Sequence, residues 1–241
     1  MRIAPLLSFA AVVALAGCAD IKAINEARDD RREFNLSGDR LVIDNDGADL
    51  RLVAGAGTTI EVQRSLTGKA TIDDNASWSM DGGTLRLRVR CSGLVPDCGG
   101  RHIVRVPAGV AVEVNSNGPV RAVGLDADLT ATVTDAWLRV EDPTGVLRLR
   151  AEYNVDVTGA RSTDVTATST GRSVELAFAS PPTRVAARAD GSVAVTLPAG
   201  SETYRVTAAP GRPALTSDAT SRRTITATAG EGHTAQVRKA S

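Results

Sequence analysis

The sequence predicts an all-β protein, and its second half predicts a parallel β-helix with about 18–20 residues per coil. Three observations support this prediction. Short runs of alternating apolar and polar residues recur between turns rich in Gly, Asp and Asn. No long amphipathic helical pattern follows residue 33. Apolar residues of the second half recur at a nearly constant spacing, which is typical of stacked structural repeats.

The N-terminus carries a processing signal that precedes the folded part of the chain. Arg2 supplies a positive charge, and the apolar run over residues 3–14 is too short to cross a membrane as a permanent helix. This run leads to LAG directly before Cys18, and the arrangement resembles the lipobox of bacterial lipoproteins. The resemblance implies that residues 1–17 are removed as a signal peptide. It also implies that acyl chains such as palmitate on Cys18 hold the exported chain on the outer face of the cell membrane.

A plain signal peptide with an incidental cysteine is the alternative to this interpretation. Residues 18–33 are polar and carry charges of both signs, so they are expected to form a solvated tether. The strand-like pattern begins at Phe34, and residues 34–241 are expected to form one β-repeat domain.

The alternating pattern in the first half of this domain predicts strands around residues 41–43, 50–53, 60–62 and 85–90. Asp44, Asp46 and Asp49 suggest a calcium loop, but an EF-hand would need ligands at Ala48 and Gly55. A tight hairpin turn explains these residues better. No metal ion and no other cofactor is therefore expected.

Cys91 and Cys98 are the two cysteines left after Cys18, in a chain expected to be exported. Disulfides persist in extracytoplasmic compartments, so this pair predicts a structural disulfide that staples a hairpin. A zinc site would need two more ligands, and only His102 is near in sequence. His102 follows a Gly-Gly-Arg turn and is expected to be a surface loop residue.

The repeat consists of two columns of apolar residues. One column contains Val120, Leu138, Val155, Val174 and Val193, at spacings of 18, 17, 19 and 19 residues. The other contains Val110, Leu129, Leu147, Val165, Val185, Val206 and Ile225. In a β-helix, equivalent residues of successive coils lie above one another, and the columns follow from this stacking. The alternative is an antiparallel β-sandwich, which also has a strand every 8–12 residues but gives no reason for such columns.

A resemblance to a known family rests on five turn–strand segments, residues 41–45, 47–52, 170–176, 190–198 and 204–206. They resemble the bacterial putative-adhesin domain of unknown function, over about residues 38–237. The resemblance implies a solenoid-like β fold and a cell-envelope setting, and it carries over no catalytic residue. The chain departs from the family pattern at residues 135–137 and 153–154, where glycine corners are replaced.

Composition excludes several classes of function. Basic and acidic side chains balance at 28 each, and aromatic residues make up 3%, so no nucleic-acid partner is expected. His102 and His233 are the only histidines, and no Gly-x-Ser-x-Gly elbow is present, so a serine-hydrolase triad is not supported. Alanines recur two positions after most members of the second column, at Ala131, Ala167, Ala187, Ala208 and Ala227. These small inward residues speak against a cavity for a lipid or another hydrophobic ligand.

The sequence therefore predicts a non-enzymatic binding or structural module of the cell envelope, with an envelope protein or a glycan as partner. Outward-facing residues of the repeat are expected to be Thr130, Thr132, Arg148, Arg150, Thr166 and Thr168. The candidate binding face consists of Arg148, Arg150, Trp137 and Tyr153, although both aromatic residues would also suit a cap over the edge of the core. The alternative function is a polysaccharide-active enzyme, which needs a pair of carboxylates. Candidates for that pair are Glu141, Asp142, Glu152, Asp156 and Glu175.

Overall fold

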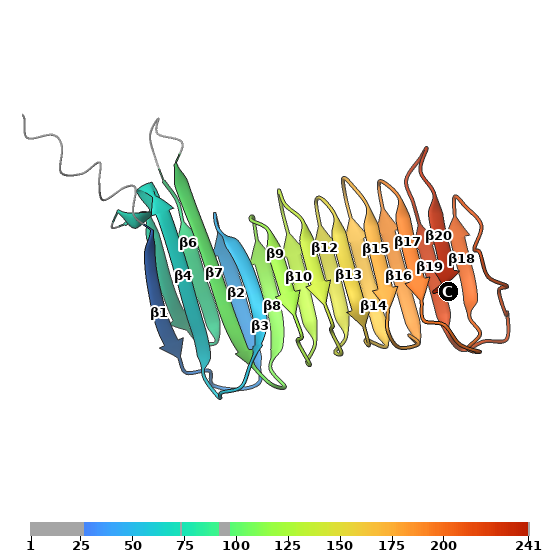
Figure 1. Cartoon of the computed structure of the whole chain (residues 1–241), viewed down its shortest axis with the longest axis horizontal. Helices are drawn as coiled ribbons and strands as arrows, with labels where there is room; N and C mark the ends of the chain where they lie inside the picture. Colours follow the sequence, from blue (N-terminus) through green and yellow to red (C-terminus); the bar gives the residue numbers. More distant parts are fainter. Residues whose placement is uncertain (1–26, 73, 92–96, 241) are drawn as a thin grey trace, which may run out of the picture.

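The computed structural model describes residues 27–72, 74–91 and 97–240, which form two ten-stranded β-sheets and one short 3-10 helix (Figure 1). The prediction of an all-β protein is confirmed. Signal peptide, lipobox and Cys18 lie outside the described residues. Within the described residues, no helix has the length and apolar character needed to cross a membrane.

Sheet A contains, in spatial order, β1 (Arg28–Phe34), β4 (Ile60–Gly68), β7 (Cys98–Pro107), β3 (Asp49–Gly55), β9 (Val120–Val123), β11 (Leu138–Glu141), β13 (Val155–Ala160), β15 (Val174–Phe178), β17 (Val193–Leu197) and β20 (Ala235–Lys239). Sheet B contains β18 (Arg205–Ala209), β19 (Thr224–Thr228), β16 (Arg184–Ala189), β14 (Asp164–Ser169), β12 (Leu147–Ala151), β10 (Leu129–Val133), β8 (Ala111–Ser116), β2 (Arg40–Asp46), β6 (Thr84–Val89) and β5 (Ala76–Asp81). The 3-10 helix spans Lys69–Thr71. The inner faces of both sheets share one continuous apolar core.

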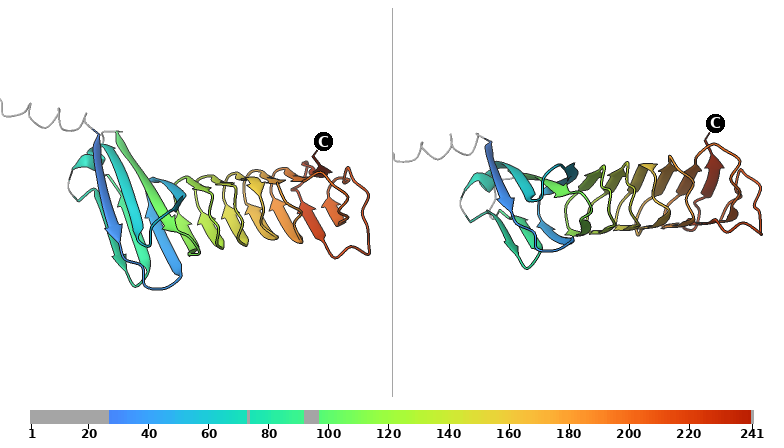
Figure 2. Two further views of the ribbon diagram at one scale, coloured as in Figure 1. Left: turned by 60° about the horizontal axis from the view of Figure 1, so that its bottom comes forward. Right: turned by 90° about the horizontal axis from the view of Figure 1, so that it is seen from below.

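The molecule has two sections along its long axis (Figure 2). The repeat section, residues 108–240, contains strands β8–β20, and up to β17 each strand lies in the other sheet from the one before it. Its strand pairs are all parallel among the described residues, as between β10 and β12. The N-terminal section, residues 27–107, adds the antiparallel pairs β1–β4, β4–β7 and β5–β6.

The two sections join at strands β2 and β3. Strand β2 pairs in parallel with β8, and β3 pairs in parallel with β9. These two strands therefore continue the columns of the repeat, with Leu50 beside Val120. The remaining strands of the N-terminal section pack on the other side of β2 and β3, so segments far apart in sequence become neighbours at this junction.

The first predicted column is confirmed by the strand register. Val120 pairs with Leu138, Leu138 with Val155, and the same register continues to Val174 and Val193. All five side chains are buried. Apolar residues two positions apart within each strand face the core because side chains of a strand alternate between its two faces.

The prediction of the second column is wrong in two places. Leu129 pairs with Val112 and not with Val110, so the first coil is offset by two residues. Val185 pairs with Ile225, and Val206 lies outside Ile225 on the edge strand β18. Both Val206 and Ile225 fit the apolar pattern, so spacing alone does not determine which of them lies next to β16.

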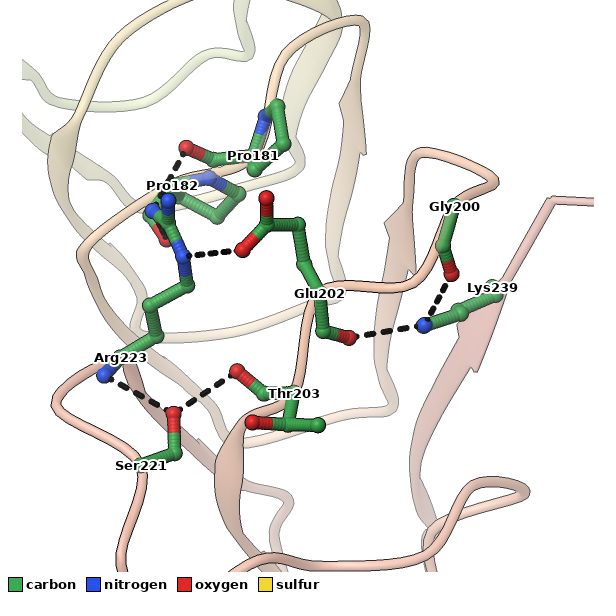
Figure 3. A network of polar contacts seen from close by, with 8 residues as sticks. All are labelled: Pro181, Pro182, Gly200, Glu202, Thr203, Ser221, Arg223 and Lys239. Atoms are coloured by element: carbon green, nitrogen blue, oxygen red, sulfur yellow. Dashed lines mark hydrogen bonds and ion pairs between the residues drawn. The ribbon is translucent and has the colours of Figure 1, made fainter.

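Polar contacts around the last strands hold this order (Figure 3). The Arg223 guanidinium donates hydrogen bonds to the backbone oxygens of Pro181 and Pro182, at 3.2 and 3.1 Å, and pairs with Glu202 at 3.1 Å. The Lys239 ammonium donates to the backbone oxygens of Gly200 and Glu202, at 2.6 and 2.8 Å. These contacts join the segment before β18 to the segments before β16 and β19 and to strand β20.

The N-terminal section corrects two further predictions. Residues 28–33, expected to be tether, belong to strand β1, because backbone pairing with β4 does not require apolar side chains. Charged residues on such an edge strand also oppose pairing with another chain. The turn at residues 44–47 does not close a hairpin, because β2 lies in sheet B and β3 in sheet A. Gly47 passes this turn with φ of 83°, and a Cβ there would lie 2.0 Å from the backbone oxygen of Val89.

The predicted disulfide between Cys91 and Cys98 is present, with a Cα–Cα distance of 6.1 Å. It does not staple a hairpin. Cys91 follows β6 of sheet B and Cys98 begins β7 of sheet A, so the bond links the two sheets.

Candidate functional site

A groove on the outer face of sheet A lies where the two sections meet. Three adjoining cavities of about 490, 430 and 370 Å³ form it, and Arg101 lines all three. Asp49 and Pro119 line the first and third cavities, and Ile103 lines the second and third. The groove thus combines residues of β3, β7 and β9 with the segments just before them.

Strand alternation places a row of arginines on this outer face. Arg51 of β3 pairs in register with Arg121 of β9, and Arg121 pairs with Arg139 of β11. Neighbouring strands lie about 4.8 Å apart, so the three guanidinium groups start from closely spaced backbone positions. Like charges on adjacent strands destabilise a sheet unless other groups compensate them.

Only part of this positive charge is compensated within the described part of the chain. Arg121 forms an ion pair with Glu141 at 2.8 Å, and the hydrogen bond and charge of Glu141 raise the pKa of Arg121. Arg139 pairs with Asp156 at 3.3 Å. The exposed side chains of Arg51 and Arg101 have no such ion pair or hydrogen bond with any described residue. The groove therefore holds two free guanidinium groups beside an exposed aromatic ring.

That ring belongs to Trp137, which lines the third cavity and is 38% exposed. The Arg139 guanidinium lies 5.6 Å from its ring centroid, within the range of a cation–π contact. Tyr153, which is 40% exposed, lies one coil further on, and Arg172 contacts its ring at 5.3 Å. Part of each ring is therefore accessible to solvent beside an arginine.

The predicted binding face is split between the two sheets. Trp137 lies beside the groove of sheet A, whereas Arg148 and Arg150 lie on the outer face of sheet B. Arg148 forms two hydrogen bonds with Asp164, at 3.0 and 2.9 Å, so its charge is compensated. The predicted outward ladder of Thr130, Thr132, Arg148, Arg150, Thr166 and Thr168 is confirmed by the register of β10, β12 and β14.

Sequence reasoning missed Arg51, Arg101 and Arg121, although a signal for two of them was present. Arg121 follows the column residue Val120, just as Arg139 follows Leu138, so both must face outward. Arg51 stands in the same position after Leu50. Arg101 has no such marker, because β7 enters sheet A through an antiparallel pairing with β4 that the repeat does not predict.

The carboxylates considered for glycoside hydrolysis are not gathered in this groove. None of Glu141, Asp142, Glu152, Asp156 and Glu175 lines any of its three cavities. Glu141 and Asp156 pair with arginines of the row, and Glu175 lies beside Asp156 on the flat face. Within the described ranges, no group of three His, Cys, Asp or Glu side chains is placed to hold a metal ion.

A buried polar cluster lies under the groove, on the inner face of sheet A. The Arg64 guanidinium pairs with Asp30 at 2.9 Å and lies 4.2 Å from the ring centroid of Trp78. His102 pairs with Arg64 in register and is fully buried, so its prediction as a surface loop residue was wrong. Burial, together with the Arg64 charge, lowers the pKa of His102 to about 4. The alternation of β7 places His102 on the same inner face as Val104.

Neither the models of known protein families nor the curated proteins gave a match to this sequence. Solved structures with a similar chain course include a putative cell adhesion protein from Clostridium sporogenes, at 11% identity and a TM-score of 0.46, covering 89% of this chain and 100% of that one. A putative adhesin from Bacteroides fragilis has 12% identity and a TM-score of 0.41, covering 88% and 97% of the two chains. A putative lipid binding protein from Parabacteroides distasonis has 13% identity and a TM-score of 0.29, covering 88% and 97%. Similarities at this level support no inference about the ligand of this chain.

Proposed function

We propose that this chain is a non-enzymatic binding module of the cell envelope, anchored by lipid at Cys18, which binds an anionic partner in the groove of sheet A. One observation carries the proposal. Arg51 and Arg101 lie in the groove without a carboxylate partner among the described residues, and Trp137 is exposed beside them. Free guanidinium groups on a rigid surface are suited to bind carboxylates or similar anions in a bidentate way.

The sheet supports such binding because it holds the arginines in place before a ligand arrives. Arg51 lies in the middle of β3, which is paired on both sides, with β7 and with β9. A strand held on both edges keeps its backbone fixed, so less conformational entropy is lost on binding. Because none of the candidate carboxylate pairs lies in the groove, we favour binding over catalysis.

The anchoring part of the proposal rests on the lipobox resemblance and agrees with a disulfide, which suits an exported chain. Strand β1 starts at Arg28, ten residues after Cys18. An extended chain of ten residues spans at most about 35 Å. An anchor at Cys18 would therefore keep the N-terminal section and its groove close to the membrane, with the repeat section extending from it.

We also infer that the repeat section is a two-sheet parallel β-solenoid. Strands that alternate between the sheets support this interpretation, as do parallel pairs in register with a spacing of 17 to 19 residues in the first column. A solenoid would serve as a rigid spacer or as a further binding surface.

Two measurements test the proposal. Labelled palmitate should enter the full-length protein and hold it in the membrane fraction of a bacterial host, whereas the Cys18→Ala variant should do neither. Absence of label from both forms would contradict the anchor.

Dextran sulfate should bind the mature protein, neutral dextran should not, and the Arg51→Gln/Arg101→Gln variant should bind dextran sulfate about tenfold or more weakly. Equal binding by this variant and the wild type would contradict the groove.

A further inference from the structure

We infer that the ligand of the groove is a carboxylate-bearing polysaccharide that lies across the strands of sheet A. This inference rests on the proposed function and specifies its ligand class. The evidence consists of the direction in which the groove runs, the arginines along it with an aromatic ring at one end, and features that other kinds of partner would need and that the described residues do not provide.

The groove runs across strands and not along one of them. Its residues come from β4, β7, β3 and β9 in spatial order, and Trp137 just before β11 lies at one end. The path from the β7 position to the β11 position crosses three strand spacings, about 14 Å in all. One pyranose unit is about as long as one strand spacing, so an extended glycan would place successive units over successive strands.

The groups along this path suit a sugar acid. Arg101 and Arg51, on the neighbouring strands β7 and β3, offer guanidinium groups that have no partner among the described residues. Trp137 offers an exposed aromatic ring, on which the C–H face of a pyranose packs while the indole N–H remains free to donate a hydrogen bond. Asp49, which pairs in register with Arg101 and lines the same cavity, is an acceptor for sugar hydroxyl groups. The arginines alone would account for the binding of any anion, whereas the exposed aromatic ring favours an anion that is part of a sugar.

Other anionic partners fit the groove less well. A peptide that binds by strand addition needs a free strand edge, and β7, β3 and β9 are each paired on both sides. A nucleic acid needs many phosphate contacts, and the chain has no net charge. The other two arginines of the row, Arg121 and Arg139, already form ion pairs with Glu141 and Asp156.

The test compares defined polymers on the mature full-length protein. Polygalacturonate carries carboxylates on a pyranose chain, its fully methyl-esterified form carries none, and poly-L-glutamate carries carboxylates without a sugar. Isothermal titration calorimetry should detect binding of polygalacturonate. The affinities of the other two polymers should be at least tenfold lower. Trp137→Ala and Arg51→Gln should each weaken polygalacturonate binding about tenfold, since one such contact typically changes affinity by that factor.

Arg188→Gln serves as the matched control, because Arg188 of β16 is also an exposed arginine with no ion pair or hydrogen bond among the described residues, but it lies on sheet B. It should leave binding unchanged, and circular dichroism should confirm that each variant is folded. Equal binding of poly-L-glutamate, with no effect of Trp137→Ala, would overturn the glycan inference and leave the anionic groove intact. Failure of wild type to bind any of the anionic polymers, dextran sulfate included, would overturn both. An equal loss of binding in Arg188→Gln would contradict the location of the binding site in the groove of sheet A.

Discussion

The N-terminal section and the repeat section use the same two sheets in different ways. The repeat section buries mainly small and branched apolar residues together with Phe178 and Tyr204, and its buried serines among the described residues include Ser162 and Ser169. The N-terminal section instead buries Arg64 and His102, adds antiparallel strands and carries the disulfide. Regular stacking produces a rigid body, and the departure from it at one end produces the groove.

This difference shows where specific features arise in a repetitive fold. Within the repeat section, each outward position pairs in register with a position on the next strand of the same sheet, as Thr130 does with Arg148 and Arg148 with Thr166. At the junction, β7 enters beside β3 and brings Arg101 next to Asp49 and Arg51. The groove lies where β7, which does not belong to the repeat section, pairs with β3 and extends sheet A.

The largest effect is expected from a cavity in the repeat section. Leu138→Ala removes a fully buried side chain of the first column and should lower the free energy of unfolding by about 2–5 kcal/mol. Because coils of a repeat contact only their neighbours, hydrogen exchange should accelerate mainly in β9, β11 and β13. Denaturant unfolding and amide exchange measure both. Thr130→Ala, on the exposed face, should change stability by about 0.5 kcal/mol or less. Uniform acceleration across both sections would contradict the division between them.

The disulfide should matter only for the N-terminal section. Cys91 and Cys98 are seven residues apart, and closing such a loop stabilises the folded state by about 2–3 kcal/mol through the entropy of the unfolded chain. The Cys91→Ser/Cys98→Ser variant should lose that much in denaturant unfolding of the N-terminal section. Reduction of the wild type should have the same effect, and the variant should not respond to reductant. A loss of stability confined to the repeat section would contradict this prediction.

The buried histidine predicts a pH dependence for the same section. The folded pKa of His102 is about 4, below its ordinary value of 6.5, because burial and Arg64 disfavour the charged form. The unfolded chain therefore takes up the proton first. This contribution to stability is present above pH 6.5, is lost as the pH falls towards 4, and should decrease by about 2 kcal/mol between pH 7 and 5.

His102→Leu removes the titrating imidazole and should remove this part of the pH dependence in urea unfolding at pH 7 and 5. The exposed His233 is the matched control, and His233→Leu should leave the pH profile unchanged. An unchanged profile in His102→Leu would show that other groups dominate the acid response.

The smallest effect is expected at the far end of the repeat. Arg223→Ala removes the hydrogen bonds to Pro181 and Pro182 and the pair with Glu202. The side chain is partly exposed, so the loss should be about 1 kcal/mol or less. Amide exchange should accelerate in β18 and β19 and stay unchanged in β1–β7. Arg222→Ala, an exposed neighbour, should change neither.

Sequence reasoning predicted the fold class and the first column because both depend on local alternation. Val120 and its counterparts face inward as a consequence of strand geometry and of a constant spacing, and both can be counted along the chain. Reasoning failed where two segments fitted one pattern, as with Val206 and Ile225, and where a strand was charged, as in β1. It also failed for His102, because the face of the sheet on which its side chain lies depends on where β7 begins.

The sequence by itself determined that the chain is all-β, that its second half repeats and that Cys91 and Cys98 pair. These properties follow from alternation, spacing and the number of available cysteines. Only the tertiary structure decided that Arg51, Arg101 and Trp137 share one groove, because they come from segments separated by up to 86 positions. Backbone pairing of β3 with both β7 and β9 brings those segments together, and backbone hydrogen bonds leave little trace in the identity of the side chains.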